Sequence, residues 1–320
     1  AVEQIKFSSD KPWFGFVSFV GPHPPLAPPI PFNRIYDPDK MPNPLCGDLQ
    51  TDLMDEQIKW MNHAIWADDI SPSLARIIKA RYYGEISFID HCLGIILDAI
   101  EKNGDAENTL ICFFSDHGDH LGDHHAWQKE SFFEQSAHIP FLLSWPSRLP
   151  RKIQRGELVC ITDLFGIATK VEGAAEVREG VDVIGMLDNL CQPRETLIGW
   201  YGEPGTPLFK MMVRFKEWKY IFMANGNRQQ LFNINTDPFE LKNVIAENYQ
   251  IATKLRDIAT HECLKRNLKT ALDNNGLRIF PYQERPLRRI YQFDLSRGVR
   301  GFLNHPADVI REWEKHSPQL

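Results

Sequence analysis

Short runs made almost wholly of apolar residues constrain the fold of this chain most. The runs are Phe14–Val20, Thr109–Phe114 and Ile139–Trp145. A strand that is apolar at every position must be covered on both faces, as in the middle of a parallel sheet. Apolar residues at helical spacing fill Ser71–Ile100, where Asn103-Gly104 ends the helix, and another helix is predicted over 162–171. Strands that alternate with helices indicate an α/β fold with a mostly parallel sheet flanked by helices.

The pattern changes near Pro193, where shorter strands separated by Gly, Pro and Asn begin. The predicted strands are Thr196–Tyr201, Phe209–Arg214, Trp218–Met223 and Gln230–Ile234. Asn225-Gly226 is typical of a hairpin turn, and a helix is predicted from Asp237 to Arg266. The sequence therefore predicts a division into parts. They are the C-terminal portion of a large α/β domain at 1–195, a smaller antiparallel sheet with its helix at 196–266, and an extended tail at 267–320.

Composition excludes several classes of partner. Of the 320 residues 43% are apolar, enough for a sizeable core, and the net charge of −6 without a basic stripe argues against a nucleic acid partner. No apolar run is long enough to cross a bilayer, so no membrane partner is expected. The 6 Cys are widely spaced without a Cys-x-x-Cys pair, which favours buried thiols over disulfides and a cytoplasmic location. Because the chain starts at Ala1, no leader can be judged, and a periplasmic location is the alternative.

The stretch Ser115–Lys129 (SDHGDHLGDHHAWQK) says most about chemistry, because it follows directly on a predicted buried strand. In open α/β sheets, ligands bind beyond the carboxyl ends of the strands. Asp116 and His117 lie at that end, and carboxylate oxygen and imidazole nitrogen are natural ligands of a divalent cation. One competing interpretation is a solvated loop whose acids and histidines pair with one another, and another is a separate zinc site. The zinc ligands would be His120, His124 and His125.

Two further residues are candidates for catalysis. Lys129 closes this stretch, where its ammonium could bind an anionic substrate or protonate a leaving oxygen, although a lone lysine is ordinarily a surface residue. His23 follows the first apolar run in the string GPHPP, within a Pro-rich loop that extends to Pro44. Its place at a strand end suits a proton donor or an oxyanion contact, with an ordinary surface histidine as the alternative.

Several stretches together resemble the sulfatase family. They are GPHPP around His23, RYYGEISFID at 81–90, FFSDHGDHLGDHHAWQK at 113–129, SAHIPFLLSWP at 136–146, GWYGE at 199–203 and LFNINTDPFELKNV at 231–244. The likeness spans most of residues 11–265, in the family's order. It is nearest to the branch that holds phosphonate monoester hydrolases and choline-sulfatase-like enzymes.

The resemblance implies an alkaline-phosphatase-like fold and metal-dependent hydrolysis of small-molecule sulfate, phosphonate or phosphate esters. It implies that Asp116 and His117 bind one divalent ion, calcium or manganese first, with magnesium or zinc as alternatives. Lys129 would contact the sulfate or phosphoryl group, and His23 would act near the leaving group. The family's nucleophile is formylglycine, made from Cys or Ser in a Cys-x-Pro-x-Arg motif, and its hydrate attacks sulfur or phosphorus.

This sequence departs from the family at the nucleophile. The string nearest to the motif, Cys191–Glu195 (CQPRE), lacks Arg at its fifth position and is interpreted as coincidence. The family's Asp-Asp pair is absent too, because Asp68-Asp69 precedes a helix and is better explained by capping or solvent-facing charge. The nucleophile and two metal carboxylates are therefore expected on a segment outside this sequence. The chain alone is expected to bind metal weakly and to show no turnover.

Two other interpretations stay open. One is a phosphatase or phosphodiesterase of the same superfamily with a Ser or Thr nucleophile, and the other is a non-catalytic remnant or subunit that keeps the fold. The Arg-rich segment Arg285–Arg300 could wrap around a neighbouring copy of the chain. A homo-oligomer formed through the C-terminal tail is therefore a further prediction.

Overall fold

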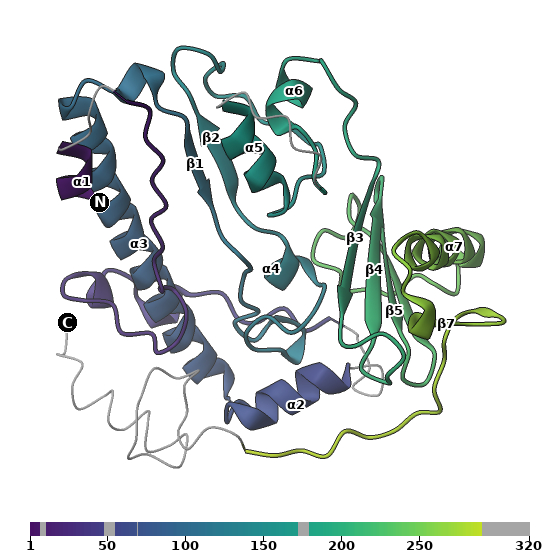
Figure 1. Ribbon diagram of the computed structural model, residues 1–320. Helices are drawn as coiled ribbons and strands as arrows, with labels where there is room; N and C mark the ends of the chain where they lie inside the picture. Colours follow the sequence, from purple (N-terminus) through teal and green to yellow (C-terminus); the bar gives the residue numbers. More distant parts are fainter. Residues whose placement is uncertain (7–10, 48–54, 69, 172–178, 290–320) are drawn as a thin grey trace.

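The computed structural model describes residues 1–6, 11–47, 55–68, 70–171 and 179–289 (Figure 1). The helices are α1 (Val2–Lys6), α2 (Glu56–Ala64), α3 (Pro72–Lys102), α4 (Glu134–Ala137), α5 (Asp163–Val171), α6 (Val183–Leu187) and α7 (Tyr249–Lys265). The strands are β1 (Ile111–Phe114), β2 (Phe141–Ser144), β3 (Thr196–Tyr201), β4 (Lys210–Phe215), β5 (Trp218–Met223), β6 (Arg228–Asn233), β7 (Leu272–Asp273) and β8 (Gly276–Leu277). Within these ranges, no helix is long and apolar enough to span a bilayer.

The ends of α3 follow from its sequence. The Ser71 Oγ accepts a hydrogen bond from the Leu74 N–H (3.2 Å), and Pro72 occupies the first turn, so the start is capped. The helix ends at Asn103, and Gly104 adopts φ +83°, a left-handed conformation that glycine tolerates. The helix that the apolar spacing predicted is confirmed.

The strands β1 and β2 pair antiparallel, with Ile111 opposite Ser144 and Phe114 opposite Phe141. A parallel pair needs a crossover, usually a helix, to return the chain to the same end of the sheet. The connection between β1 and β2 holds only the four-residue α4 and short turns, so the chain doubles back. The α/β class is confirmed, but these two strands do not form the predicted parallel pair.

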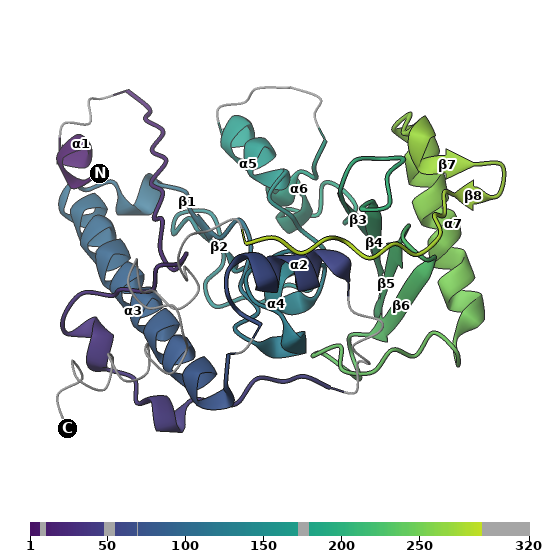
Figure 2. The same cartoon turned by 90° about the horizontal axis from the view of Figure 1, so that it is seen from below.

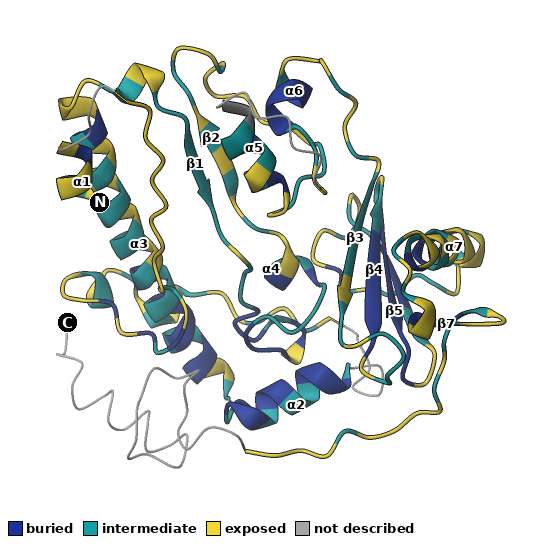
Figure 3. Cartoon of the chain, in the orientation of Figure 1, coloured by how far each residue is buried: buried dark blue, intermediate teal, exposed yellow. Residues whose placement is uncertain are grey.

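The apolar run Phe14–Val20 is not a strand, and its predicted burial is wrong. Phe14, Phe16 and Val20 are 75%, 69% and 84% exposed. The run lies beside β1, since the rings of Phe16 and Phe114 are 6.4 Å apart between centroids (Figures 1 and 3). An extended chain becomes a strand only when a neighbour takes up its N–H and C=O groups. Within the described ranges no strand pairs with the run, and its Val20 carbonyl accepts only a local hydrogen bond from the His23 N–H.

The small sheet is antiparallel in the order β3-β4-β5-β6, close to where the sequence placed its strands. Alternate residues of a strand point to opposite faces. One face packs on α7 in a core that includes Met211, Val213, Tyr220, Phe222, Leu255 and Ala259. The other face packs on α2 and on the 126–133 loop, in a core of Ile58, Ala126, Phe133, Met212, Ile221 and Phe232. Both faces are therefore covered (Figure 3).

The helix predicted from Asp237 begins only at Tyr249. Between β6 and α7, side chains bind the backbone instead: the Asp237 Oδ2 accepts the Lys242 N–H (2.9 Å), and the Asn243 Oδ1 accepts the Leu231 N–H (2.9 Å). Local bonds of this kind compete with helical hydrogen bonds. The end of α7 agrees with the prediction.

Helix α2 was not predicted from the sequence. The Asp55 carboxylate caps it by accepting the Gln57 N–H (2.8 Å), and Arg228 of β6 forms an ion pair with Glu56. Two of the helix residues, Glu56 and Gln57, are polar but buried, which is why apolar periodicity did not reveal α2.

The segment of the tail that carries Arg285 and Arg289 runs along α2 (Figure 2). The Arg285 guanidinium lies 4.0 Å from the Trp60 ring centroid, and the Arg289 guanidinium lies 4.2 Å from that of Trp66. This part of the tail therefore packs on its own chain. The remainder of Arg285–Arg300 lies outside the described residues, so assembly through it stays a prediction.

Candidate metal and anion site

Asp116 and His117 follow β1 after Ser115, as the sequence placed them. The Asp116 Oδ1 accepts the His117 N–H (2.9 Å), and the Asp116 Oδ2 lies 3.4 Å from the His117 Nε2. The His117 Nδ1 lies 2.8 Å from the Gly118 carbonyl oxygen. A carbonyl only accepts, so Nδ1 carries the proton and Nε2 keeps its lone pair. The structure thus brings one carboxylate oxygen and one imidazole nitrogen together at the strand end.

The loop after these residues folds back on itself. The Gly118 N–H donates to the Ser136 carbonyl (2.8 Å), and the His120 N–H donates to the Gln128 carbonyl (3.0 Å). A Cβ at Gly118 would stand 2.1 Å from the Gln135 carbonyl oxygen, so only glycine permits this approach. The stretch is therefore a compact unit with its own backbone hydrogen bonds, in contrast to the solvated loop that was the competing interpretation.

Asp119 lies in the loop between His117 and Lys129. Its Oδ1 accepts the N–H groups of Leu121 (3.0 Å) and Gln128 (3.0 Å), which fixes the carboxylate inside the loop. Burial raises the pKa of Asp119, while these two hydrogen bonds and the nearby His117 and His23 lower it.

His23 lies in a tight turn that α3 anchors. Its N–H donates to the Val20 carbonyl (3.1 Å), and its Nδ1 lies 2.8 Å from the Pro24 carbonyl oxygen, so Nε2 is the nitrogen left to act on a ligand. The Glu85 Oε1 on α3 accepts the Ala27 N–H (3.0 Å) and ties the turn to the helix. The side chain of His23 is exposed, which suits a group that exchanges a proton with a ligand.

Lys129 closes the loop on the other side. Its carbonyl accepts hydrogen bonds from the Ser131 N–H (2.7 Å) and the Ser136 Oγ (2.5 Å). The residue before it, Gln128, donates its N–H to Asp119. The Lys129 backbone is thereby fixed next to Gln128, the residue that contacts Asp119. Of the four site residues that the sequence predicted, Asp116 and His117 contact each other, whereas His23 and Lys129 are held by backbone contacts of their own.

Three residues near this site were not singled out from the sequence: Asp119, Tyr82 and Glu85. Burial raises the pKa of Tyr82, and the charges of Asp119 and Asp116 add to the effect. Burial also raises the pKa of Glu85, against the lowering effect of the Ala27 N–H. Tyr82 and Glu85 are three apart and share a helix face. The signal was RYYGEISFID, where polar residues interrupt an apolar helix face.

Asp116 and His117 fit part of a metal site. Their donor atoms are 3.4 Å apart, comparable with the roughly 3 Å that separates neighbouring ligands of one calcium-sized ion. Both side chains are reachable from solvent, at 76% and 31% exposed. Over the ranges that the structure describes, no third histidine, cysteine or carboxylate joins them in a group that could hold a metal. Any cation bound here needs further ligands, because its shell takes about six.

His120 and His124 are packed into the core, and the zinc site that the sequence left open is not formed by the described residues. The His120 Nε2 lies 2.6 Å from the Ser131 Oγ, and the His124 ring stacks on Phe133 at 4.0 Å between centroids. Both side chains are buried, whereas His125 is exposed. Two of the three candidate ligands, His120 and His124, pack on aromatic rings and therefore do not share a metal centre with His125.

Two strings that resemble family motifs have structural roles instead. Arg194 of the CQPRE string makes two hydrogen bonds to the buried Asp163 (2.7 and 3.0 Å). Asp68 forms ion pairs with His63 (3.0 Å) and Arg289 (2.8 Å). Its neighbour in the sequence, residue 69, lies outside the described residues. The contacts of Arg194 and Asp68 are thus with residues other than Asp116 and His117.

Comparison with known proteins adds independent observations. The model of the sulfatase family matches residues 1–166. An arylsulfatase of Clostridium perfringens (strain 13 / Type A) is 32% identical over 247 residues, which cover 75% of this chain and 51% of that protein. A choline-sulfatase of Rhizobium meliloti (strain 1021) is 29% identical over 248 residues, which cover 75% and 47%. The structure of a phosphonate monoester hydrolase of Agrobacterium radiobacter superposes with a TM-score of 0.70 at 24% identity, covering 86% of this chain and 62% of that one.

The chain belongs to the sulfatase family, within the alkaline-phosphatase-like superfamily. The likeness to the phosphonate monoester hydrolase supports the fold alone, because the identity is low. The chain spans about half the length of the curated relatives that it matches. Members of the family generally use a divalent metal and formylglycine, and sulfate ester substrates fit the family. The resemblance drawn from the sequence motifs is confirmed.

Proposed function

We propose that this chain contributes metal ligands and substrate-binding groups to a hydrolase of sulfate or phosphonate esters. The main support is the pairing of Asp116 with His117 at the end of β1, in a loop whose Asp119 carboxylate accepts the N–H of Gln128, the residue before Lys129. Relatives named as an arylsulfatase and a choline-sulfatase support sulfate esters as the substrate class, and the structural neighbours named as phosphonate monoester hydrolases share the fold.

Each residue has a role that its position allows. Asp116 and His117, whose Oδ2 and Nε2 are 3.4 Å apart, would hold the cation, calcium or manganese. When bound, the cation supplies Lewis-acid stabilisation of charge on the ester oxygens. The Lys129 ammonium binds the anionic group of the ester. A protonated His23 gives its Nε2 proton to the leaving oxygen, while its Nδ1–H stays bonded to the Pro24 carbonyl.

The nucleophile and the remaining metal carboxylates belong, in this proposal, to a further polypeptide segment. The sequence holds no Cys-x-Pro-x-Arg motif from which formylglycine could be made. The run Phe14–Val20 beside β1 supports this, because it offers exposed apolar surface to such a segment and, within the described ranges, no strand pairs with it. A pure preparation of this chain should therefore not hydrolyse 4-nitrophenyl sulfate, and measured turnover would contradict the proposal.

Two broader expectations also remain proposals. A cytoplasmic location is supported by the cysteines, which are free thiols in the structure. Assembly of copies through the tail would have to use residues beyond Arg289, because Arg285 and Arg289 already contact α2 of their own chain.

Manganese binding tests the metal site directly. Mn²⁺ is titrated into the whole chain, and free Mn²⁺ is followed by electron paramagnetic resonance. Binding should be weak in the unmodified chain and about tenfold weaker in Asp116→Ala and His117→Ala, because each removes one of two donors. Asp68→Ala is the matched control, since Asp68 is an acidic residue held by His63 and Arg289, and it should bind as the unmodified chain does. Equal Mn²⁺ affinity in all four proteins would rule the site out.

Inorganic sulfate tests the anion-binding group. Calorimetric titration should show a lower sulfate affinity in Lys129→Met than in the unmodified chain, by about tenfold if the ammonium contacts the anion. Lys216→Met is the matched control, because Lys216 is an exposed lysine in the turn between β4 and β5. Equal loss in both variants would indicate a general charge effect and contradict the role of Lys129.

A further inference from the structure

Two lysines of the small sheet are almost completely buried on the face that meets the Lys129 loop. Lys210 on β4 is 2% exposed and Lys219 on β5 is 1% exposed. Lysine is rarely buried to this degree without a specific partner, because its ammonium must leave water. Both point away from α7, toward the residues that follow Lys129. Their burial therefore needs an explanation that the α7 core does not provide.

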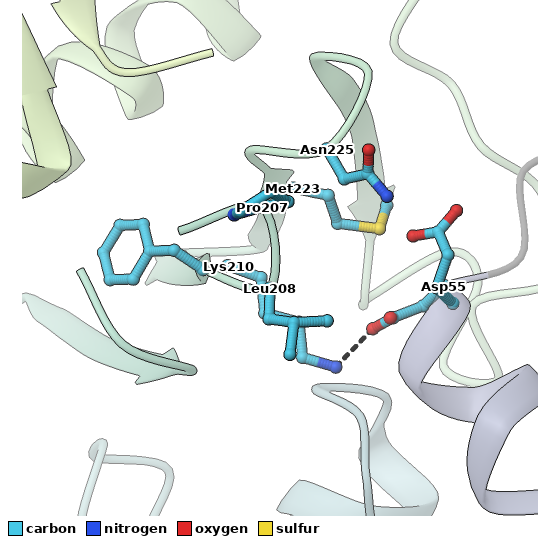
Figure 4. A pocket seen from close by; sticks show the side chains of 8 residues that line it. Asp55, Pro207, Leu208, Lys210, Met223 and Asn225 are labelled. Atoms are coloured by element: carbon cyan, nitrogen blue, oxygen red, sulfur yellow. Dashed lines mark hydrogen bonds and ion pairs between the residues drawn. The ribbon is translucent and has the colours of Figure 1, made fainter. Parts of the chain in front are cut away.

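Lys210 holds the first peptide after Lys129. Its Nζ donates to the Glu130 carbonyl (2.7 Å) and pairs with the Asp55 carboxylate (Figure 4). The aromatic ring of Tyr201 lies 4.8 Å from the ammonium, measured to the ring centroid. A charged donor in a site of low dielectric makes a stronger hydrogen bond than a neutral one. The Glu130 carbonyl is thus held from the sheet.

Lys219 holds the same loop two residues further on. Its Nζ donates to the Phe132 carbonyl (2.8 Å) and pairs with Glu134 (2.5 Å) and Glu240 (2.8 Å). Glu240 is fully buried and also accepts the Glu134 N–H (2.6 Å). The carbonyls of residues 130 and 132 are therefore both fixed by ammonium groups of the sheet.

Between the two carbonyls lies Ser131, which connects them to the site. Its N–H donates to the Lys129 carbonyl (2.7 Å), and its Oγ lies 2.6 Å from the His120 Nε2. Fixing the peptides at 130 and 132 therefore fixes the carbonyl of Lys129 and the start of its side chain. Apolar residues could bury the same area, but they could not direct these carbonyls.

We propose that Lys210 and Lys219 are positioning residues for Lys129, which makes the small sheet part of the machinery of the site. The proposal deepens the function proposed above, since it takes Lys129 as the group that binds the anion. Removal of either ammonium frees a carbonyl and lets the loop shift. A shift of about 1 Å at a group that must meet a ligand can lower activity by about a hundredfold.

Hydrogen exchange followed by mass spectrometry tests the proposal in the whole chain. Lys210→Met and Lys219→Met should each lose protection in the segment 128–137. The matched control is Val213→Ala, which creates a cavity on the α7 face of the same sheet and should lose protection in α7 but not in 128–137. Lys210→Met combined with Asp55→Asn leaves no unpaired charge and keeps a capping residue on α2, so one variant stays foldable.

Sulfate titration of the same variants connects position to binding. The two Lys→Met variants should bind inorganic sulfate about tenfold more weakly than Val213→Ala. Unchanged protection of 128–137, or lost protection with unchanged sulfate affinity, would overturn the positioning role. If the unmodified chain binds no sulfate, the function proposed for Lys129 fails, and the exchange result alone then decides whether the lysines hold the loop.

Discussion

The small sheet and the region around β1 are both built from apolar strands but are buried very differently. Tyr220 and Phe222 of β5 are fully buried, because α7 covers one face of the sheet and α2 with the 126–133 loop covers the other. Near β1, by contrast, Phe16 is 69% exposed and Leu142 of β2 is 58% exposed. The difference is one of neighbours, since residue types are similar in both regions.

The comparison shows that an apolar run in the sequence indicates a segment that needs to be buried. The run does not determine which other segment buries it. The strands β3 to β6 follow one another and α7 comes next, so local hairpins bring the partners together. The run Phe14–Val20 has no such neighbour within the described ranges. The candidate site joins the two regions: Asp116 and His117 stand at the end of β1, while the loop after Lys129 is held by the small sheet.

The same substitution in the two regions should give the largest difference. Phe222→Ala removes a ring that is fully buried under α7 and should lower the free energy of unfolding by about 3–5 kcal/mol. Phe16→Ala removes an exposed ring and should change it by less than about 0.5 kcal/mol. Urea unfolding of both variants measures this. Similar losses would show that the Phe14–Val20 run is covered in solution.

Low pH should reduce the stability of the folded chain because two of its histidines are buried. Burial lowers the pKa of His120 to about 3 and that of His124 to about 4, from an ordinary value of 6.5; each also feels the positive charge of Lys219, while Asp123 opposes the shift of His124. Below pH 6.5 the unfolded chain takes up protons that the folded chain refuses. Stability should therefore fall with pH by up to about 1.4 kcal/mol per unit for each histidine, and not change on this account above pH 7.

A matched pair of variants isolates this effect. His124 and His125 both have positive φ (56° and 54°), which asparagine tolerates, but only His124 is buried. His124→Asn should reduce the dependence of the urea midpoint on pH between 6.5 and 4, whereas His125→Asn should leave it unchanged. An unchanged slope in His124→Asn would exclude His124 as a source of acid sensitivity.

Two glycines of α3 should respond in opposite directions. A Cβ at Gly84 would lie 2.5 Å from the Phe32 carbonyl oxygen, so Gly84→Ala should push away the Pro-rich loop and lower stability by about 1–3 kcal/mol. Nothing lies within 4 Å of a Cβ at Gly94, so Gly94→Ala should raise stability by about 0.5–1 kcal/mol through helix propensity. Urea midpoints measure both. A neutral Gly84→Ala would mean that the loop does not pack on α3.

The smallest effect on stability should come from replacing exposed apolar residues beside β1, although this clearly changes the apolar surface. Phe14→Ser combined with Val20→Ser removes two exposed apolar side chains beside β1 and should change the free energy of unfolding by less than about 0.5 kcal/mol. Binding of an apolar fluorescent dye should nevertheless fall, because these residues belong to one uncovered patch. Leu190→Ser, an equally exposed residue after α6, is the control and should reduce dye binding less.

Much of the local structure could be predicted because the signals are local. Ser71, Pro72 and Asn103-Gly104 bound α3 by capping, and Asn225-Gly226 turns β5 into β6, where Gly226 has φ +72°. The start of α7 could not be predicted, since the bonds that Asp237 and Asn243 make depend on where β6 lies. The helix α2 was missed because its buried face is partly polar and finds its partners in β6.

The sequence by itself determined the family, many of the elements, such as α3 and the strands of the small sheet, and the candidates His23, Asp116, His117 and Lys129, because motif spacing and caps are properties of neighbouring residues. Only the tertiary structure decided which carboxylate fixes the loop between His117 and Lys129 and which lysines hold the residues after it. Asp119, Lys210 and Lys219 act through contacts with residues far away in the chain or on the other face of a loop. The tertiary structure also decides which side chains are buried, because a side chain is covered only by segments that the fold brings to it.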